Sequence, residues 1–104
     1  MIITKESSEN KVTLLLDGWL DTEAAPLLGN EIEKIENVRE IVIDFDKVEY
    51  MSSSGLRQVI AAHKVAKEQG AALNLVNVHP EVMNIFEFTG LDKKISIAVA
   101  EEKA

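Results

Sequence analysis

Three consecutive serines, Ser52, Ser53 and Ser54, are the residues of this chain whose types and spacing point most directly to chemistry. They precede Gly55 at the point where a β-branched run ends and an amphipathic helical pattern begins. A helix N-terminus offers free backbone N–H groups and the positive end of the helix dipole, and both favour an anionic group. A serine there can cap the helix, or it can accept a phosphate that a partner then recognises. Both interpretations stay open at this point.

Asp44 and Asp46 are the strongest enzymatic alternative, because they flank Phe45 near the end of a predicted strand. Two carboxylates there could hold Mg²⁺ or accept a phosphoryl group, provided that further acids and a lysine converge from other strand ends. Asp17 and Lys93 are the available candidates, but no adjacent acidic pair follows the first strand. We therefore rank an aspartyl-phosphate site below a binding function, and we predict that the chain is not an enzyme.

Other residue types exclude several further chemistries. The chain has no cysteine, which excludes thiol catalysis, thiolate metal sites and disulfides. His63 fits the apolar face of its helix and His79 precedes a proline, so the two histidines form no metal-ligand pattern. The five glycines are isolated, so the chain has no glycine-rich phosphate cradle. We accordingly expect no catalytic residue, no metal and no cofactor.

Length and charge narrow the class of protein. A chain of 104 residues has the length of one domain, so we expect a single domain over residues 1–104. Its hydrophobic content of 46% is typical of a globular protein, and its formal charge of −7 argues against nucleic-acid binding. Residues 1–5 are too short for a signal peptide, and no apolar run approaches membrane-spanning length. We expect a cytoplasmic protein with no membrane span.

Strand and helix patterns alternate along the chain. Strands are predicted over residues 2–5, 12–16, 41–45, 71–78 and 95–99. The first is expected at an edge of the sheet, and the strand over residues 41–45 is expected to be buried between helical layers. This alternation predicts right-handed crossovers. The fold class is α/β, with a mostly parallel mixed sheet of about four to five strands packed with three or more helices.

Three helices are predicted between these strands. The first begins after a cap at Asp21 or Thr22, with Pro26 in its first turn; the second runs from the serines to Gln69 and stops at Gly70; the third opens at Pro80. The apolar stripe expected on the first comprises Ala24, Leu27, Leu28, Ile32 and Ile35, and that on the second comprises Leu56, Val59, Ile60, His63 and Ala66.

Loops after the carboxyl ends of parallel strands are where function gathers in such sheets. Residues 17–21, 46–54 and 77–80 form three loops of this kind, and we expect them to lie close together. Trp19 and Tyr50 fall in two of these loops, although aromatic residues more commonly serve packing.

Residues 47–56, which contain the three serines, resemble the signature of bacterial anti-sigma factor antagonists, the stand-alone STAS domains. In that family a strand and a short hydrophobic loop lead into an Asp-Ser-Ser/Thr-Gly-Leu turn. Residues 18–21 are similar to the family's Gly-x-Leu-Asp, and residues 86–91 resemble the end of its third helix. The resemblance runs from about Val12 to Ile97, nearly the whole chain.

The resemblance implies a partner-switching function. A serine-kinase anti-sigma factor would bind the unphosphorylated antagonist and release a sigma factor, then phosphorylate the antagonist and separate from it. A phosphoserine phosphatase would reset the cycle. The acceptor corresponds to Ser53, with Ser54 and Ser52 as secondary candidates. Ser52 stands where the family has an aspartate, so a carboxylate beside the acceptor is missing.

The expected partner footprint combines two loops with the start of the second helix. Its residues are Gly18, Trp19, Leu20, Asp21, Met51, Ser52, Gly55, Arg57 and Gln58. The alternative function is a non-switching STAS subunit of a transporter-associated or signalling-scaffold complex. In either case we expect a monomer or a weak dimer.

Overall fold

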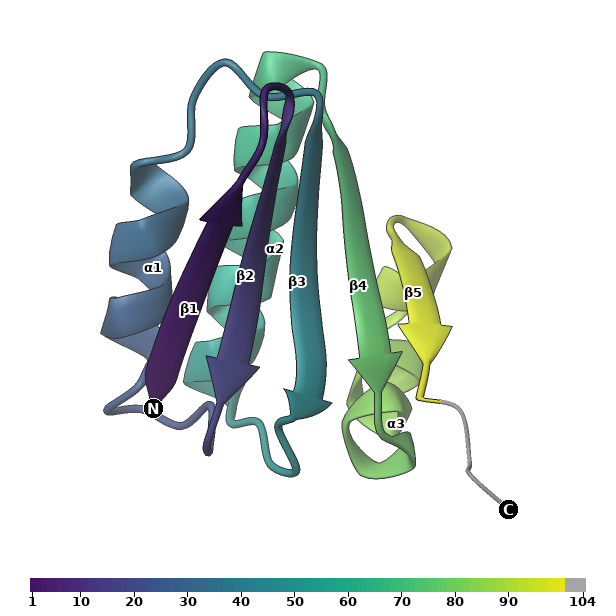
Figure 1. Ribbon diagram of the computed structural model, residues 1–104. Coiled ribbons are helices and arrows are strands. Elements are labelled where there is room, and N and C mark those ends of the chain that lie inside the picture. The colour runs from purple at the N-terminus through teal and green to yellow at the C-terminus, as the bar shows by residue number, and fades with distance from the viewer. Residues whose placement is uncertain (101–104) are drawn as a thin grey trace.

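A five-stranded mixed sheet forms the frame of the computed structural model, which describes residues 1–100 (Figure 1). The last four residues of the predicted domain therefore lie outside the described residues. The strands lie side by side in chain order: β1 (Ile2–Ser7), β2 (Lys11–Asp17), β3 (Glu40–Lys47), β4 (Ala72–Val78) and β5 (Ser96–Val99). β1 pairs antiparallel with β2, and the other neighbours pair in parallel. The predicted mostly parallel mixed sheet is confirmed.

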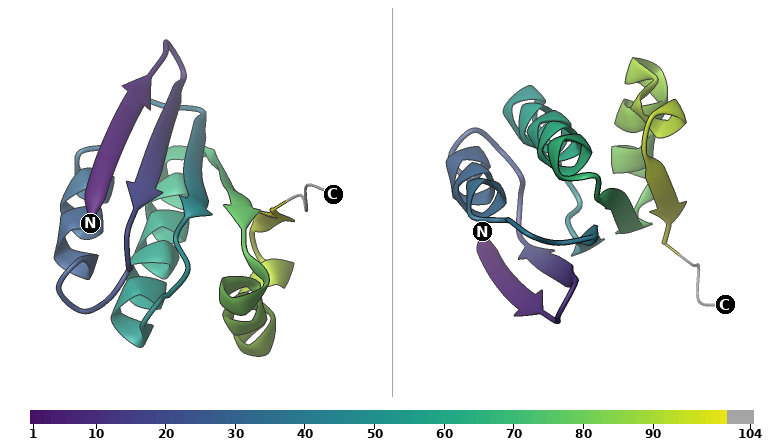
Figure 2. Two further views of the ribbon diagram at one scale, coloured as in Figure 1. Left: turned by 60° about the horizontal axis from the view of Figure 1, so that its bottom comes forward. Right: turned by 90° about the horizontal axis from the view of Figure 1, so that it is seen from above.

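Three helices connect the parallel strands: α1 (Ala25–Glu33), α2 (Ser53–Gln69) and α3 (Pro80–Thr89). A 3-10 turn, η1 (Leu91–Lys93), follows α3 and leads into β5. Figure 2 shows all three helices on one face of the sheet. Within residues 1–100 no helix is long and apolar enough to cross a membrane.

The core lies between that face and the helices. Ile41, Ile43 and Phe45 alternate along β3, are completely buried, and point toward the helices. Phe45 packs edge-to-face on Phe86 of α3, with ring centroids 6.0 Å apart. The expectation that β3 lies between two helical layers was wrong. Asp44, on the opposite face, is only half-buried, and no helix of the described residues covers that face.

The predicted helix boundaries are largely confirmed. Pro26 falls in the first turn of α1, and Pro80 opens α3. Gly70 ends α2 with a φ of 68°, a left-handed conformation that glycine adopts without a steric penalty. Asp21 does not cap α1 itself: its Oδ1 accepts from the N–H groups of Glu23 and Ala24 and so closes the turn that precedes the helix.

Two residues of the predicted apolar stripes are exposed, so their predicted burial was wrong. Leu27 is 46% exposed and Ile60 is 47% exposed, while His63 is half-buried. Each helix has a single sheet face to cover, so only a narrow stripe of its surface is buried. The buried residues of α1 and α2 are Ala25, Leu28, Ile32, Gly55, Val59, Ala62 and Ala66.

Candidate functional site

The loops that follow β2 and β3 are joined by backbone hydrogen bonds. The Leu20 N–H donates to the Tyr50 carbonyl at 3.0 Å, and the Ser52 N–H donates to the Leu20 carbonyl at 2.9 Å. Leu20 and Met51 form an isolated parallel bridge, so the pairing of β2 with β3 resumes inside the loops. The start of α2 is thereby held against residues 18–21.

The loop after β4 joins the same edge. Asn77 Nδ2 donates to Asp44 Oδ1 at 3.1 Å, and His79 Nε2 contacts the Asp46 carbonyl oxygen. The prediction that residues 17–21, 46–54 and 77–80 lie close together is therefore confirmed.

The three serines have different environments. Ser52 is the N-cap of α2: its Oγ accepts from the Gly55 N–H at 3.2 Å and donates to the Leu20 carbonyl at 3.4 Å. Ser54 is half-buried, with its Oγ 3.5 Å from Thr22 Oγ1. Ser53 is exposed, and its side chain makes no hydrogen bond with the residues that the structure describes. The cap that the sequence left open to any of the three serines is therefore made by Ser52, and not by Ser53 or Ser54.

Gly55 is required by close packing at the start of α2. A Cβ added there would lie 2.6 Å from the Leu20 carbonyl oxygen and 2.7 Å from Leu20 Cγ, and 3.0 Å from Met51 Cγ. These separations are shorter than van der Waals contact. Glycine at position 55 thus allows α2 to begin in direct contact with the loop that follows β2.

The residues of the predicted partner footprint differ in how exposed they are. Leu20, Met51 and Gly55 are buried and position the loops, so they present little surface to a partner. Gln58 is half-buried and lies over α1, since a Cβ added at Gly29 would meet its Oε1 at 2.7 Å. The other residues of the predicted footprint are exposed or half-buried, namely Gly18, Trp19, Asp21, Ser52, Arg57 and Gln58.

Tyr50 is a surface residue that the predicted footprint missed. It is 50% exposed and lies beside Trp19, which is 65% exposed, with the ring centroids 5.7 Å apart. A packing role was the ordinary expectation for both aromatic residues. Trp19 was already part of the predicted footprint, and the signal that could have added Tyr50 is its position as a second aromatic residue in a neighbouring loop at the same edge of the sheet.

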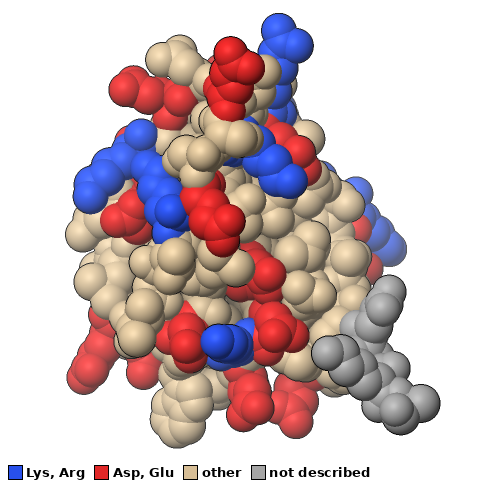
Figure 3. Space-filling view, in the orientation of Figure 1, with Lys and Arg blue, Asp and Glu red and all other residues tan. Residues whose placement is uncertain are grey.

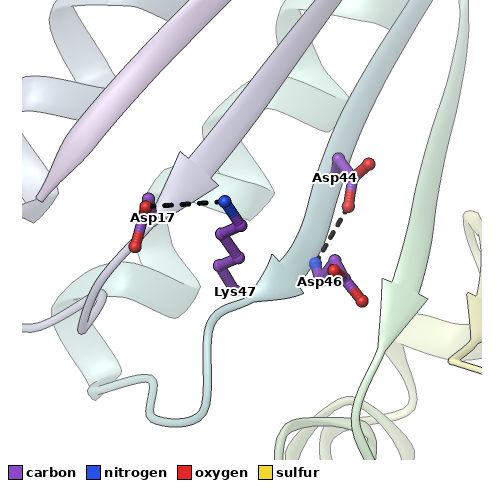
Figure 4. Close-up of polar contacts among 4 residues, drawn as sticks. All are labelled: Asp17, Asp44, Asp46 and Lys47. Atoms are coloured by element: carbon purple, nitrogen blue, oxygen red, sulfur yellow. Dashed lines mark hydrogen bonds and ion pairs between the residues drawn. The ribbon is translucent and has the colours of Figure 1, made fainter.

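The aspartates of the enzymatic alternative are engaged in local contacts (Figure 4). Asp44 Oδ1 accepts from the Asp46 N–H at 2.9 Å, and Asp17 lies 4.0 Å from the Lys47 ammonium. Lys93 does not join them, because it lies in η1 at the amino end of β5, the opposite edge of the sheet. Within residues 1–100 no group of three or more histidine, aspartate or glutamate side chains is arranged to hold a metal ion.

Negative charge gathers at the edge that carries the serines. Figure 3, viewed as in Figure 1, shows several Asp and Glu side chains at the end where β2 and β3 terminate, with little Lys or Arg between them. A single basic residue, Arg57, lies in the first two turns of α2, and it is exposed. Acidic residues of the surrounding loops are Asp17, Asp21, Glu23, Asp46 and Glu49.

Comparisons with known proteins agree with this geometry. A family model described as the STAS domain matches residues 2–104. The anti-sigma-B factor antagonist of Bacillus subtilis (strain 168) is 30% identical over 98 residues, which is 93% of this chain and 90% of that protein. These findings confirm the resemblance that was drawn from residues 18–21, 47–56 and 86–91.

Solved structures share the fold. The anti-sigma factor antagonist SpoIIAA in its unphosphorylated form superimposes with a TM-score of 0.79 at 24% identity, covering 94% of this chain and 89% of that chain. The phosphorylated form of the Bacillus cell fate determinant SpoIIAA gives a TM-score of 0.76 at 24% identity, covering 94% of this chain and 92% of that chain. The sheet with helices on one face is common to all three.

Proposed function

The chain belongs to the STAS domain family, and on that premise we propose that it is an anti-sigma factor antagonist, a phosphorylatable binding protein of the cytoplasm. In its unphosphorylated form it binds a serine-kinase anti-sigma factor and thereby frees a sigma factor. The kinase then phosphorylates Ser53, and the complex separates. A phosphoserine phosphatase restores the binding form.

The exposure of Ser53 is the observation that carries this proposal. Ser53 is the first residue of α2, and its hydroxyl has no hydrogen-bond partner among residues 1–100. The Ser52 hydroxyl is engaged in capping, and the half-buried Ser54 lies against Thr22. Of the three adjacent hydroxyls, Ser53 is therefore the one that a kinase can reach without disturbing a contact.

A phosphate at this position has opposite consequences in the free protein and in a complex. Phosphoserine carries about −1.5 to −2 charges, which the N–H groups and dipole at a helix N-terminus tolerate. Arg57 lies one turn later on α2, so an i, i+4 ion pair with the phosphate is within reach. Inside an interface the same charge must lose its water, and a penalty of about 2.7 kcal/mol weakens binding roughly 100-fold.

Mapping of the phosphorylated residue tests the assignment. The wild-type protein, Ser53→Ala and Ser54→Ala are incubated with ATP and the serine-kinase anti-sigma factor of the host, and modified peptides are identified by mass spectrometry. We expect stoichiometric phosphate on Ser53 in wild type and in Ser54→Ala, and none in Ser53→Ala. Phosphate on Ser54 alone, or on an aspartate, contradicts the proposal. Binding of the kinase without any phosphorylation favours the non-switching alternative.

A further inference from the structure

Trp19 and Tyr50 form an exposed aromatic pair beside the serine loop, and we propose that this pair seats a cationic side chain of the partner protein. The cation is an arginine or a lysine of the serine-kinase anti-sigma factor, which stacks on the Trp19 ring and approaches the carboxylates of Asp21 and Glu23. The inference rests on the proposed function, since that function names the partner.

The aromatic pair is exposed but fixed in position. The Gly18 N–H donates to the Lys47 carbonyl at 3.1 Å, and the Leu20 N–H donates to the Tyr50 carbonyl at 3.0 Å. The chain neighbours of Trp19 are thus bonded to the last residue of β3 and to the loop after β3 that carries Tyr50. Because these bonds hold the backbone, a partner that binds the rings has little loop motion to freeze, which favours affinity.

Two carboxylates lie beside Trp19, and the Met1 α-amino group lies near the same loop. A hollow of about 270 Å³ beside it is lined by Asp21 and Glu23 together with the apolar side chains of Met1 and Leu27. Asp21 Oδ1 accepts from two backbone N–H groups, which fixes the orientation of that carboxylate. Neither Asp21 nor Glu23 forms a salt bridge with any of residues 1–100.

An aromatic face beside unpaired carboxylates matches the requirements of a cation. A guanidinium or ammonium group is attracted to the face of tryptophan more strongly than to that of phenylalanine. An arginine can stack on the ring while it donates hydrogen bonds to a carboxylate. The apolar floor of the hollow suits the aliphatic stem of either basic side chain. A negatively charged protein or nucleic acid would meet repulsion here.

Phe88 provides an internal control for exposed aromatic surface. It is 93% exposed in the last turn of α3, toward the amino end of β5 and away from the serine edge. No aromatic ring of the described residues is paired with it. Because Phe88 lies outside the expected interface, its loss tests whether exposed aromatic surface contributes to binding irrespective of its position.

Titration calorimetry of the unphosphorylated protein with the kinase tests the proposal. We expect Trp19→Ala to weaken binding between 10-fold and 100-fold, as at a central interface residue, and Trp19→Phe to weaken it by a smaller factor. Glu23→Gln should weaken binding a few-fold and should reduce the dependence of affinity on salt. Phe88→Ala should bind within two-fold of wild type.

Two readouts guard against misinterpretation. Melting curves of all variants should match wild type, because each altered side chain is exposed. Trp19 is the only tryptophan, so 5-fluorotryptophan labelling gives one ¹⁹F resonance, which should shift on adding unlabelled kinase to the wild-type protein.

The outcomes separate this inference from the proposed function. Wild type that fails to bind the kinase, or that binds equally with and without phosphate on Ser53, contradicts the proposed function. Binding that is lost on phosphorylation but is unchanged by Trp19→Ala overturns the aromatic site alone. A third outcome is that Trp19→Ala weakens binding while Trp19→Phe and Glu23→Gln bind as tightly as wild type. That result contradicts a cation at this site and indicates an apolar contact of Trp19 instead.

Discussion

The two ends of α2 differ in how they are held. Where β2 and β3 end, backbone hydrogen bonds run between loops that are distant in sequence, as from Ser52 to Leu20. Where β4 begins, α2 ends on a local cap, in which the Gly70 N–H donates to the Lys67 carbonyl and the Ala71 N–H donates to the Ala66 carbonyl. Long-range backbone bonds also occur near this end, as from the Ala72 N–H to the Arg39 carbonyl, but the end of α2 itself is held by its local cap.

Gly55 and Gly70, at the two ends of α2, make the same contrast at the level of single residues. Gly55 is needed because Leu20 lies too close for a Cβ, although its own backbone is helical. Gly70 has nothing within 4 Å of an added Cβ, and its positive φ alone favours glycine. The start of α2 thus depends on packing between loops, while its end depends on backbone conformation.

A negative charge at Ser53 should have the largest effect, and it should act on binding alone. Ser53→Asp should weaken binding of the kinase by up to about 100-fold, equivalent to about 2.7 kcal/mol, because the charge must be desolvated in the interface. A single carboxylate carries less charge than phosphate, so the loss can be partial.

Ser53→Ala is the matched control, since it removes the hydroxyl without adding charge. It should bind at least as well as wild type and should resist release by ATP. Titration calorimetry gives all three affinities, and thermal melting should show no difference, because the Ser53 side chain makes no hydrogen bond within residues 1–100. Equal affinities of wild type and Ser53→Asp would contradict the proposal that phosphorylation of Ser53 releases the kinase.

An alanine at either glycine tests the contrast between packing and conformation. Gly55→Ala should destabilise the protein by about 2–3 kcal/mol through overpacking against Leu20, a loss of very roughly 10–20 °C in melting temperature for a domain of this size. Gly70→Ala should cost only about 1–2 kcal/mol, the penalty of a left-handed alanine.

Partner binding separates these two variants further. Measured well below its melting temperature, Gly55→Ala should also weaken binding of the kinase, because the strained contact lies under the serine loop. Gly70→Ala should bind as wild type does. If Gly70→Ala proves the more damaging variant in both urea denaturation and binding, the distinction between the two ends of α2 is wrong.

Amide chemical shifts on adding the kinase map the surface directly. We expect perturbations in residues 18–23 and 50–58, since their loops meet at one edge through the bonds between Leu20, Tyr50 and Ser52. Amides near Gly70 and Gly90 should keep their shifts. Perturbations confined to that opposite edge would refute the placement of the interface.

The predicted elements succeeded where local rules decide the structure. Gly70 marks the end of α2 and Pro80 the start of α3, because cap conformations depend on the residue itself. The exposure of Ile60 could not be predicted in this way, since helical periodicity marks an apolar residue without revealing how wide a face the sheet covers.

The site was predictable in position but not in detail. Hydroxyls at a strand-to-helix junction located the loop, yet the capping role of Ser52 depends partly on the Leu20 carbonyl, which reaches it from the loop after β2. The burial of Met51 has the same origin, because its bridge to Leu20 forms only in the folded sheet. Pairing between distant loops leaves no periodic pattern in the chain.

The smallest expected effect comes from restoring the family's aspartate at the N-cap. In Ser52→Asp a carboxylate oxygen can still accept from the Gly55 N–H, and it gains about 0.3–1 kcal/mol from the helix dipole. It cannot donate to the Leu20 carbonyl, as the serine hydroxyl does at 3.4 Å. These two changes oppose each other, so we expect the melting temperature to shift by only a few degrees.

Phosphorylation kinetics should respond more clearly than stability to Ser52→Asp. We expect faster phosphorylation of Ser53, by a few-fold, because a carboxylate beside the acceptor can orient its hydroxyl for in-line attack and kinase catalysis depends largely on positioning. Repulsion between this carboxylate and the phosphates of ATP works in the opposite direction. Single-turnover assays with one kinase compare Ser52→Asp with wild type. Ser52→Ala is the control, because it loses about 0.5–2 kcal/mol of capping energy without adding a charge. A slower Ser52→Asp with an unchanged melting temperature would mean that the kinase of this protein is adapted to the serine.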